Sequence, residues 1–431
     1  MQSPRSYFKK AENTFLQLSS NGRNLLLSFF LFALATPMIS LFTNFFLWHQ
    51  GKHILLIVLF NIGTYLTMPV GFFSNAFLLR YVSVTKLYFG AGVIQGLAPI
   101  VLIFCRTIDP WQVFLIGLVL GYSSGFFWGN RNLLTAEITR SEDRIKFISL
   151  ESMVSAIANI ISPLITGWIL VSGQYLQNTT PELGYQIMSV VAVILLWSAG
   201  KACLKVDIAI SHTSPLLLKK PIPIWSSQRI LETLAGLEHS WAIMVGLLLI
   251  FIFFEKESFA GTLNSFLALL SAAMVYYAVR WKSKTLRITM LAWWLIGATI
   301  ATGLFLINQS WYGVLLYLGL SAITGSFYNT GIMSLLYDVI DLDKTHRKYT
   351  YLTDRESFLT LGRITGLVVF ALVYTMAPNE ALLCFMIARV IIKTALYWQI
   401  RYVDQTVRFP TFFDSRPPAL APVKTTRQTP Q

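Results

Sequence analysis

Apolar runs of about twenty residues recur along the chain from Leu25 to Ile400, separated by short polar or basic segments. A run of this length matches a helix that crosses the hydrocarbon core of a bilayer. The pattern predicts an all-α, polytopic membrane protein with twelve transmembrane helices. We place the predicted spans at 24–48, 53–79, 87–105, 111–137, 148–172, 184–204, 230–254, 259–280, 288–308, 311–338, 356–378 and 380–401.

Basic residues are distributed unevenly between the segments that join these spans. If the N-terminus is cytoplasmic, the outer loops hold only Lys52, Arg106 and Lys256, and the other basic loop residues lie inside. Cytoplasmic loops of membrane proteins are enriched in Lys and Arg, so this asymmetry predicts that both termini are cytoplasmic. It also accounts for the formal charge of +14, and nucleic acid is therefore not an expected partner.

The chain divides into two similar halves. GFFWGNRNLLTAEITRSEDRIKFISLES in the first half and GSFYNTGIMSLLYDVIDLDKTHRKYTYLTDRES in the second share a glycine–aromatic start, an acid at the helix end, a basic loop and a final Glu-Ser. Parallel six-helix pseudo-repeats are typical of a large class of secondary transporters. We therefore predict a cytoplasmic N-terminal segment at 1–23, six-helix halves at 24–204 and 230–401, a central cytoplasmic loop at 205–229 and a disordered cytoplasmic tail at 402–431.

Several motifs resemble those of the major facilitator superfamily over residues 20–401. GFFSNAFLLR resembles the family's Gly-x-Leu-x-Asp-Arg-x-Gly-Arg-Arg loop, with Asn75 at the Asp position and Arg80 at the last basic position. The fifth span, SAIANIISPLITGW, is similar to the Gly-x-x-x-Gly-Pro-x-x-Gly-Gly pattern of the family's exporters, and its small residues predict close helix packing. TAEITRSEDR resembles the loop between spans four and five, with Arg144 as its basic residue, whereas Gly121 replaces the central Arg of many proton-coupled members. The resemblance implies alternating access between the halves, with spans one, four, seven and ten lining a cavity.

Charged residues inside the spans are expected to form ion pairs, because a lone charge within a bilayer is costly. Arg131 in span four can bridge to Glu151 at the start of span five, and Arg363 in span eleven can bridge to Asp338 or Glu356. We predict that these pairs latch the cytoplasmic gate, with substrate or proton binding as the alternative. The remaining candidates for gating or coupling are Asn75, Arg80, Glu137, Arg144 and Asp341.

Arg389 and Lys393 lie on one face of the last span, and no acid in that helix is placed to pair with them. Lys393 can extend toward the interface. For Arg389 the simplest interpretation is contact with a lipid phosphate, or a helix that is shifted in the bilayer. His212 and His239 are isolated and are interpreted as loop or interface groups.

Uncharged polar and aromatic side chains occupy the predicted middle of the spans. Their matching places in the two repeats predict a mid-membrane cavity bordered by Tyr122, Trp128, Tyr328 and Asn329. Because fixed charge is absent there, such a cavity suits an uncharged or amphiphilic solute, and helix packing is the alternative role of each residue taken alone. The candidate substrate-binding residues are Asn44, Asn61, Tyr122, Ser124, Trp128, Asn130, Asn159, Asn264, Tyr328 and Asn329.

Together these features predict a secondary transporter that exports a small uncharged or amphiphilic solute, driven by a proton gradient because the sequence has no nucleotide-binding motif. The alternatives are a cation-coupled sugar or nutrient symporter, with sodium or a proton as the coupling ion, and a non-transporting scaffold or receptor. We predict no enzymatic activity, catalytic residue, cofactor or metal site, and the three scattered cysteines argue against a disulfide framework. The expected partners are the solute, the coupling ion and membrane lipids. We expect a monomer, located in the cell (inner) membrane if the source is bacterial.

Overall fold

The computed structural model describes residues 15, 18–49, 54–104, 109–138, 141–177, 182–208, 217–254, 257–278, 286–343 and 347–408. These residues form twelve helices, of which ten are long and apolar enough to cross a membrane. The protein is therefore an all-α, multi-pass membrane protein. The helices are α2 (Ser20–His49), α3 (Ile54–Leu78), α4 (Val84–Phe104), α5 (Pro110–Ile138), α6 (Ser141–Gln177), α7 (Glu182–Leu204), α8 (Trp225–Phe253), α9 (Glu257–Ala278), α10 (Leu286–Ile307), α11 (Trp311–Asp341), α12 (Lys348–Met376) and α13 (Pro378–Arg408).

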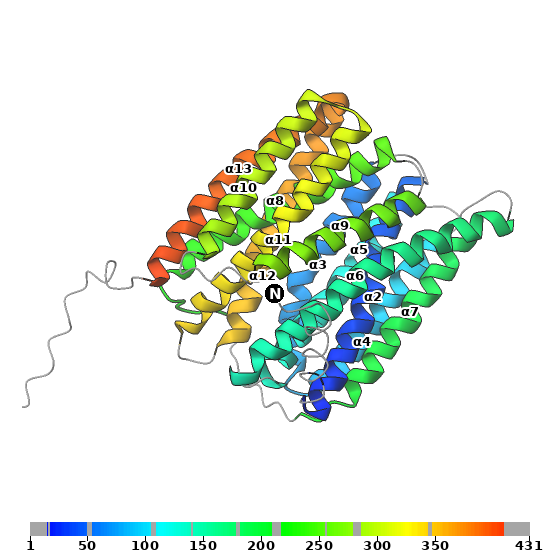
Figure 1. Ribbon diagram of the computed structural model, residues 1–431. Helices are drawn as coiled ribbons and strands as arrows, with labels where there is room; N and C mark the ends of the chain where they lie inside the picture. Colours follow the sequence, from blue (N-terminus) through cyan, green and yellow to red (C-terminus); the bar gives the residue numbers. More distant parts are fainter. Residues whose placement is uncertain are drawn as a thin grey trace, which may run out of the picture.

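The two halves of the chain lie side by side in one bundle (Figure 1). Helices α2, α4 and α7 lie at one side of the bundle, and α8, α10 and α13 lie at the other (Figure 1). Between them, α6 contacts α9 and α3 contacts α12, so helices of the first half meet helices of the second directly. This arrangement places a boundary between the halves along the middle of the molecule.

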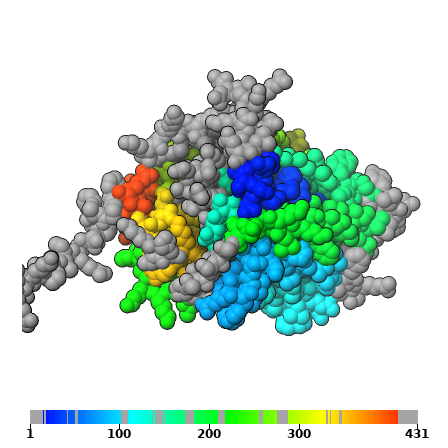
Figure 2. Space-filling view, turned by 90° about the horizontal axis from the view of Figure 1, so that it is seen from below, coloured from blue at the N-terminus to red at the C-terminus, as the bar shows by residue number. Residues whose placement is uncertain are grey.

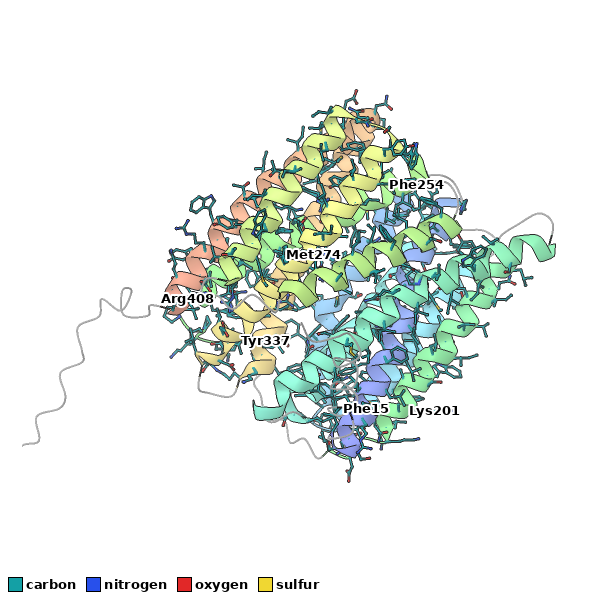
Figure 3. All side chains as sticks on the ribbon, viewed as in Figure 1. Phe15, Lys201, Phe254, Met274, Tyr337 and Arg408 are labelled. Atoms are coloured by element: carbon teal, nitrogen blue, oxygen red, sulfur yellow. The ribbon has the colours of Figure 1, made fainter. Side chains whose placement is uncertain are left out.

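The bundle has two distinct ends. Lys201 and Arg408 mark one end, which we call the basic end, and Phe254 marks the opposite, far end (Figure 3). At the basic end the start of α2 lies against the residues that follow α7 (Figure 2). Asn21 fixes this contact, because its Nδ2 donates to the carbonyl oxygen of Asp207 at 2.8 Å. The first and last helices of the first half are thus held together.

Several helices extend beyond the predicted spans; α6 and α12, for example, begin at Ser141 and Lys348, ahead of the predicted 148 and 356. α8 begins at Trp225, inside the predicted central loop. α13 continues to Arg408, so the prediction of a disordered tail is wrong for 402–408, and 409–431 lie outside the described residues. Asp404 explains the longer helix, because it forms ion pairs of 2.6 and 2.8 Å with two arginines. Hydropathy alone does not register this stabilisation.

Glycines allow α3 and α5 to approach closely. A Cβ at Gly121 would overlap the backbone carbonyl of Thr64, and a Cβ at Gly125 would overlap that of Met68. Backbone atoms within a helix have little room to yield. The position at which the resemblance suggested a central Arg is therefore a helix contact.

We expect Gly121→Val to remove most of the folded protein, because the new side chain has to push α3 away from α5. Gly303→Val is the matched control, since a Cβ there has no atom within 4 Å. Fluorescence-detected size-exclusion chromatography of both variants would measure the folded yield. A normal, monodisperse peak for Gly121→Val would show that the two helices are not locked together.

Candidate functional site

A cavity of about 800 Å³ lies between the two halves of the chain. Its walls come from α2, α3 and α6 of the first half and from α8, α9 and α11 of the second. None of the described residues that line it is charged. We call it the amide cavity, and its polar lining residues are Thr36, Ser40, Asn44, Asn61, Tyr65, Ser152, Ser155, Asn159, Asn264, Ser271 and Ser326.

Three asparagines of the amide cavity are held by their own helices. The Nδ2 atoms of Asn44, Asn61 and Asn264 each donate, at 2.8 Å, to the carbonyl oxygen one turn earlier. The nitrogen of each amide is thereby anchored, and the Oδ1 atom remains as an acceptor. Among the described residues the buried Oδ1 of Asn44 has no hydrogen-bond partner. Such acceptors suit a solute that carries hydroxyl or N–H donors.

Aromatic and small residues join the two halves near the far end. Phe251 of α8 packs edge-on against Phe45 of α2 at 4.9 Å and stacks on Trp48 at 4.6 Å between ring centroids. In α9, a Cβ at Gly261 would overlap the carbonyl oxygen of Pro163 in α6. The small residues of the fifth-span motif therefore allow close packing between α6 and α9, as predicted.

At the basic end, Asn75 links α3, α5 and α12. Its Nδ2 donates to Tyr349 Oη at 2.9 Å, and its Oδ1 accepts from Asn130 Nδ2 at 2.8 Å. Tyr349 Oη in turn donates to the carbonyl oxygen of Phe72 at 3.3 Å. Asn75 thus lies at an interface between the halves, and Asn130 belongs to this network rather than to the lining of the cavity that we predicted.

A second pocket, of about 370 Å³, lies within the second half of the chain among α8, α10, α11, α12 and α13. Unlike the amide cavity, it is lined by ionisable side chains, and Ala242 lines both spaces. The predicted absence of fixed charge thus describes the amide cavity but not its neighbour. We call this space the charged pocket, and its ionisable lining residues are Glu238, His239, Arg355, Arg363, Arg389 and Lys393.

Glu238 pairs with Arg389 and Lys393 of α13. Its Oε1 accepts from Arg389 Nη2 at 2.9 Å, and Lys393 Nζ lies 3.7 Å from the same oxygen. Arg389 and Lys393 are only 7% and 4% exposed. The interpretation of Arg389 as a lipid-phosphate contact is therefore wrong, because its partner is an acid of α8 that is distant in the sequence.

Arg363 lies at the boundary between the halves. Its Nη1 donates to Glu356 Oε1 at 2.7 Å, and its guanidinium lies 4.8 Å above the ring of Tyr65 in α3. Tyr65 Oη also lies 3.4 Å from His239 Nε2. His239 therefore borders a cavity, and its interpretation as an isolated loop or interface group is corrected.

Arg131 and Glu151 form an ion pair that bridges α5 and α6. The guanidinium of Arg131 also lies 4.8 Å above the ring of Phe29 and 4.9 Å above that of Trp128. The pair lies within the first half of the chain. It can therefore hold α5 against α6 directly, and any effect on a gate between the halves has to pass through these helices.

The other candidate gating residues are dispersed. Asp338 pairs with an arginine of α10 at 2.5 Å, so the predicted alternative partner of Arg363 is corrected, and Asp341 pairs with a lysine of α12 at 2.7 Å. Arg80 and Glu137 are exposed, and the side chain of Arg144 lies outside the described residues. The described side chains among them lie near helix ends and line neither the amide cavity nor the charged pocket.

We expect Arg131→Glu or Glu151→Arg alone to reduce the yield of folded protein strongly, because each leaves two like charges facing each other where the structure has an ion pair. The double swap should recover at least half of the lost yield, since the opposite charges meet again. The folded yield and melting temperature of all three variants would measure the recovery. A double swap that performs no better than the weaker single variant would exclude coupling between the two side chains.

Four of the candidate substrate-binding residues line the amide cavity: Asn44, Asn61, Asn159 and Asn264. Tyr328 lies instead in the charged pocket, where its ring stacks on that of Trp294 at 4.3 Å between centroids. Asn329 belongs to α11, but its side chain lies outside the described residues. The sequence signal thus located the amides of the cavity better than its aromatic residues.

The candidates on α5 lie away from both spaces. Ser124 Oγ accepts from Gln95 Nε2 of α4 at 2.9 Å, and the ring of Tyr122 packs against that of Phe126. Trp128 packs edge-on against Phe32 of α2 at 6.3 Å between ring centroids. Neither Tyr122 nor Trp128 lines the amide cavity or the charged pocket, so the structure does not bring them together with the asparagines of the amide cavity.

Sequence comparisons relate the chain to proteins of undescribed function. No family model matches it. Uncharacterized protein YqgE of Bacillus subtilis (strain 168) is 26% identical over 371 residues, which cover 81% of this chain and 82% of that protein. An uncharacterized protein encoded in the sodM 3′ region of Geobacillus stearothermophilus is 27% identical over 142 residues, which cover 33% of this chain and 66% of that protein.

Solved structures show a much broader likeness. The nucleoside transporter NupG superposes with a TM-score of 0.62 at 14% identity, covering 89% of this chain and 99% of that one. FucP, a major facilitator superfamily transporter in the outward conformation, gives 0.62 at 13% identity, covering 89% and 99%. A D-xylose-proton symporter gives 0.67 at 11% identity, covering 89% and 96%. At these identities the likeness is one of fold, and the chain has the fold of the major facilitator superfamily.

Proposed function

We propose that this chain, which has the major facilitator fold, is a secondary transporter of a small solute rich in hydroxyl or N–H donors. The observation that carries the proposal is the amide cavity, because its walls come from both halves and its anchored amides present acceptors. A cavity shared by two bundles is reached from opposite sides when the bundles rock about it. This geometry supports alternating access, whereas a scaffold has no need of such a cavity.

Contacts at the two ends of the bundle are the proposed gates. Phe251 with Phe45 and Trp48 joins α8 to α2 near the far end, and Asn75 with Tyr349 joins α3 to α12 at the basic end. The proposal requires the two sets of contacts to loosen in alternation. Both sets are uncharged, so they can separate without exposing a lone ion to lipid.

We propose a proton as the coupling ion, with Glu356 as its acceptor. Glu356 is 4% exposed and pairs with Arg363, which lies above the ring of Tyr65 in the opposite half. The carboxylate also faces Arg355, at 3.9 Å. Protonation would cancel the charge that holds Arg363, and that arginine would then be free to leave α3 or to bind solute. A sodium ion is the alternative.

For the direction of transport we favour uptake by symport over the export that the fifth-span motif suggested. The motif residue Pro163 contacts Gly261 across the boundary between the halves, so close packing accounts for the small residues of the motif. Two of the similar folds belong to transporters named as proton symporters, of fucose and of D-xylose. Export remains the alternative, and the flux assay below decides between them.

Proteoliposome flux tests the proposal. Purified protein would be reconstituted, a pH gradient imposed in either orientation, and uptake of labelled polyols, sugars and nucleosides followed. We expect uptake of at least one hydroxylated solute to follow the gradient and to collapse with a protonophore. Empty vesicles are the control for leakage. Absence of gradient-driven flux across the panel would favour a scaffold or receptor, and flux dependent on sodium alone would replace the proton.

We propose that the basic end faces the cytoplasm. Cysteines introduced at 173–183, from the end of α6 to the start of α7, should react with an impermeant maleimide added to intact cells. Cysteines introduced at 210–220, between α7 and α8, should react only after the cells are opened. The expected ratio of labelling exceeds about tenfold, because the bilayer blocks the reagent. The reverse pattern would invert the topology that the basic residues predict.

A further inference from the structure

The ionisable groups of the charged pocket do not balance. Its four cations face three carboxylates, on Glu232, Glu238 and Glu356. Glu232 Oε2 lies 3.1 Å from Arg355 Nε, and Glu356 Oε1 lies 2.7 Å from Arg363 Nη1. These pairs leave Glu238 as the remaining acid for two cations. Among the described residues, the pocket therefore has one cation in excess.

Lys393 is the cation with the weakest pairing. Its Nζ lies 3.7 Å from a Glu238 oxygen that already accepts from Arg389, which is beyond ordinary hydrogen-bonding distance. The same nitrogen lies 5.1 Å from the centroid of the Trp294 ring, where a cation–π contact contributes modestly. An ammonium that is 4% exposed and so incompletely paired favours the arrival of an anion.

Further donors around the pocket have no acceptor. Tyr328 Oη and the Nε atoms of Arg363 and Arg389 are buried without a hydrogen-bond partner among the described residues. Guanidinium N–H groups are donors only, and the phenol can donate as well. A carboxylate supplies the acceptors that such groups lack, and its bonds to cations are among the stronger hydrogen bonds in proteins.

The charged pocket and the amide cavity are placed to hold two parts of one molecule. Ala242 lines both, and Tyr65 of the amide cavity lies 3.4 Å from His239 of the charged pocket. One space offers donors and a positive charge, and the other offers amide acceptors without charge. A ligand that spans them needs an anionic group at one end and hydroxyl groups at the other.

We propose that the solute is a polyhydroxy monocarboxylate, a sugar acid, whose carboxylate binds beside Lys393 while its hydroxyl groups bind the amide cavity. The inference narrows the proposed transport function and rests on it. One negative charge balances the pocket, whereas a dicarboxylate would leave a surplus negative charge in a poorly solvated site. A neutral polyol would leave the ammonium group of Lys393 incompletely paired.

Three solutes with the same six-carbon skeleton test whether a solute with one negative charge binds best. Gluconate, sorbitol and glucarate would be titrated into the purified, detergent-solubilised protein and followed by calorimetry. We expect gluconate to bind at least tenfold more tightly than sorbitol, and glucarate to bind more weakly than gluconate. Equal affinities for gluconate and sorbitol, or tightest binding of glucarate, would overturn the inference.

Substitution of Lys393 locates the carboxylate. Lys393→Gln should reduce gluconate affinity to that of sorbitol and leave sorbitol binding within about twofold. Lys201→Gln, on the exposed basic end, is the matched control and should change neither. If Lys393→Gln does not fold, Lys393→Arg keeps the charge and should keep the preference for gluconate. A preference that survives in a folded Lys393→Gln would overturn the assignment to this residue.

Proteoliposome flux distinguishes failure of the sugar-acid inference from failure of the transport proposal. Gradient-driven flux of sorbitol and gluconate at equal rates, with equal binding, would overturn the sugar-acid inference and leave the transport proposal standing. Absence of binding and of flux for all three solutes, and for the wider panel above, would overturn both. Gluconate flux that saturates at lower concentration than sorbitol flux supports both.

Discussion

Replacing Glu238 with glutamine is expected to remove most of the folded, active protein. The substitution leaves Arg389 and Lys393 buried together without their shared carboxylate. Removing one partner of a buried ion pair costs about 3–5 kcal/mol, and the two remaining cations also repel each other. This loss is a large part of the roughly 5–15 kcal/mol that holds a typical protein folded.

The measurement is the folded yield and melting temperature of the purified variant, followed by solute flux where enough protein survives. Glu380→Gln is the matched control, because Glu380 is an exposed acid at the start of α13. Glu238→Gln combined with Lys393→Met should recover part of the yield, since removal of the second cation restores the original charge balance. The recovered protein should still bind a neutral polyol.

A Glu238→Gln protein that folds and melts like the native one would contradict this account. It would show that water or a lipid headgroup solvates Arg389 and Lys393, in spite of their small exposed fractions. Recovery of the yield without recovery of flux would assign Glu238 a role in the transport cycle beyond its role in folding.

The sequence predicted the membrane-spanning helices because hydropathy measures the free energy that places a helix in lipid, residue by residue. It also predicted contacts between neighbouring helices. Arg131 and Glu151 lie twenty residues apart on consecutive helices, so their approach follows from a short connection. The packing of α6 followed from small residues that tolerate a close neighbour, although the sequence did not identify that neighbour as α9.

Neither hydropathy nor contacts between neighbouring helices predicted the charged pocket. Glu238 and Arg389 are 151 residues apart, and their contact depends on α13 packing against α8. The sequence also did not predict the rotation of each helix about its own axis. Hydropathy gives the depth of Trp128 but not its direction, and α5 turns it toward Phe32 rather than toward the amide cavity. Asn61 and Asn264 do line the amide cavity, because an amide at that depth needs a polar surface to face.

Removing the amide acceptors from both halves is expected to weaken solute binding more than removing either alone. Asn61 in α3 and Asn264 in α9 each present an anchored amide to the amide cavity. Leucine keeps a similar volume and removes the acceptor. A hydrogen bond to a neutral group contributes about 0.5–1.5 kcal/mol, so each single substitution should raise the solute dissociation constant roughly 2- to 12-fold. Independent losses multiply, and the double variant should lose up to about 150-fold in affinity.

Monodeoxy analogues of the best hydroxylated solute distinguish binding from packing. If Asn264 accepts from one hydroxyl, the analogue that lacks this hydroxyl should bind the unmodified protein weakly and should lose nothing further in Asn264→Leu. Asn308→Leu makes the same chemical change at an exposed site outside the cavity lining and should leave every affinity unchanged. Equal losses for the parent solute and all its deoxy analogues in Asn264→Leu would show that the amide supports helix packing. The role of Asn264 as a hydrogen-bond acceptor for the solute would then be rejected. The same analogues measured with Asn61→Leu would test that role for Asn61, on the opposite wall of the cavity.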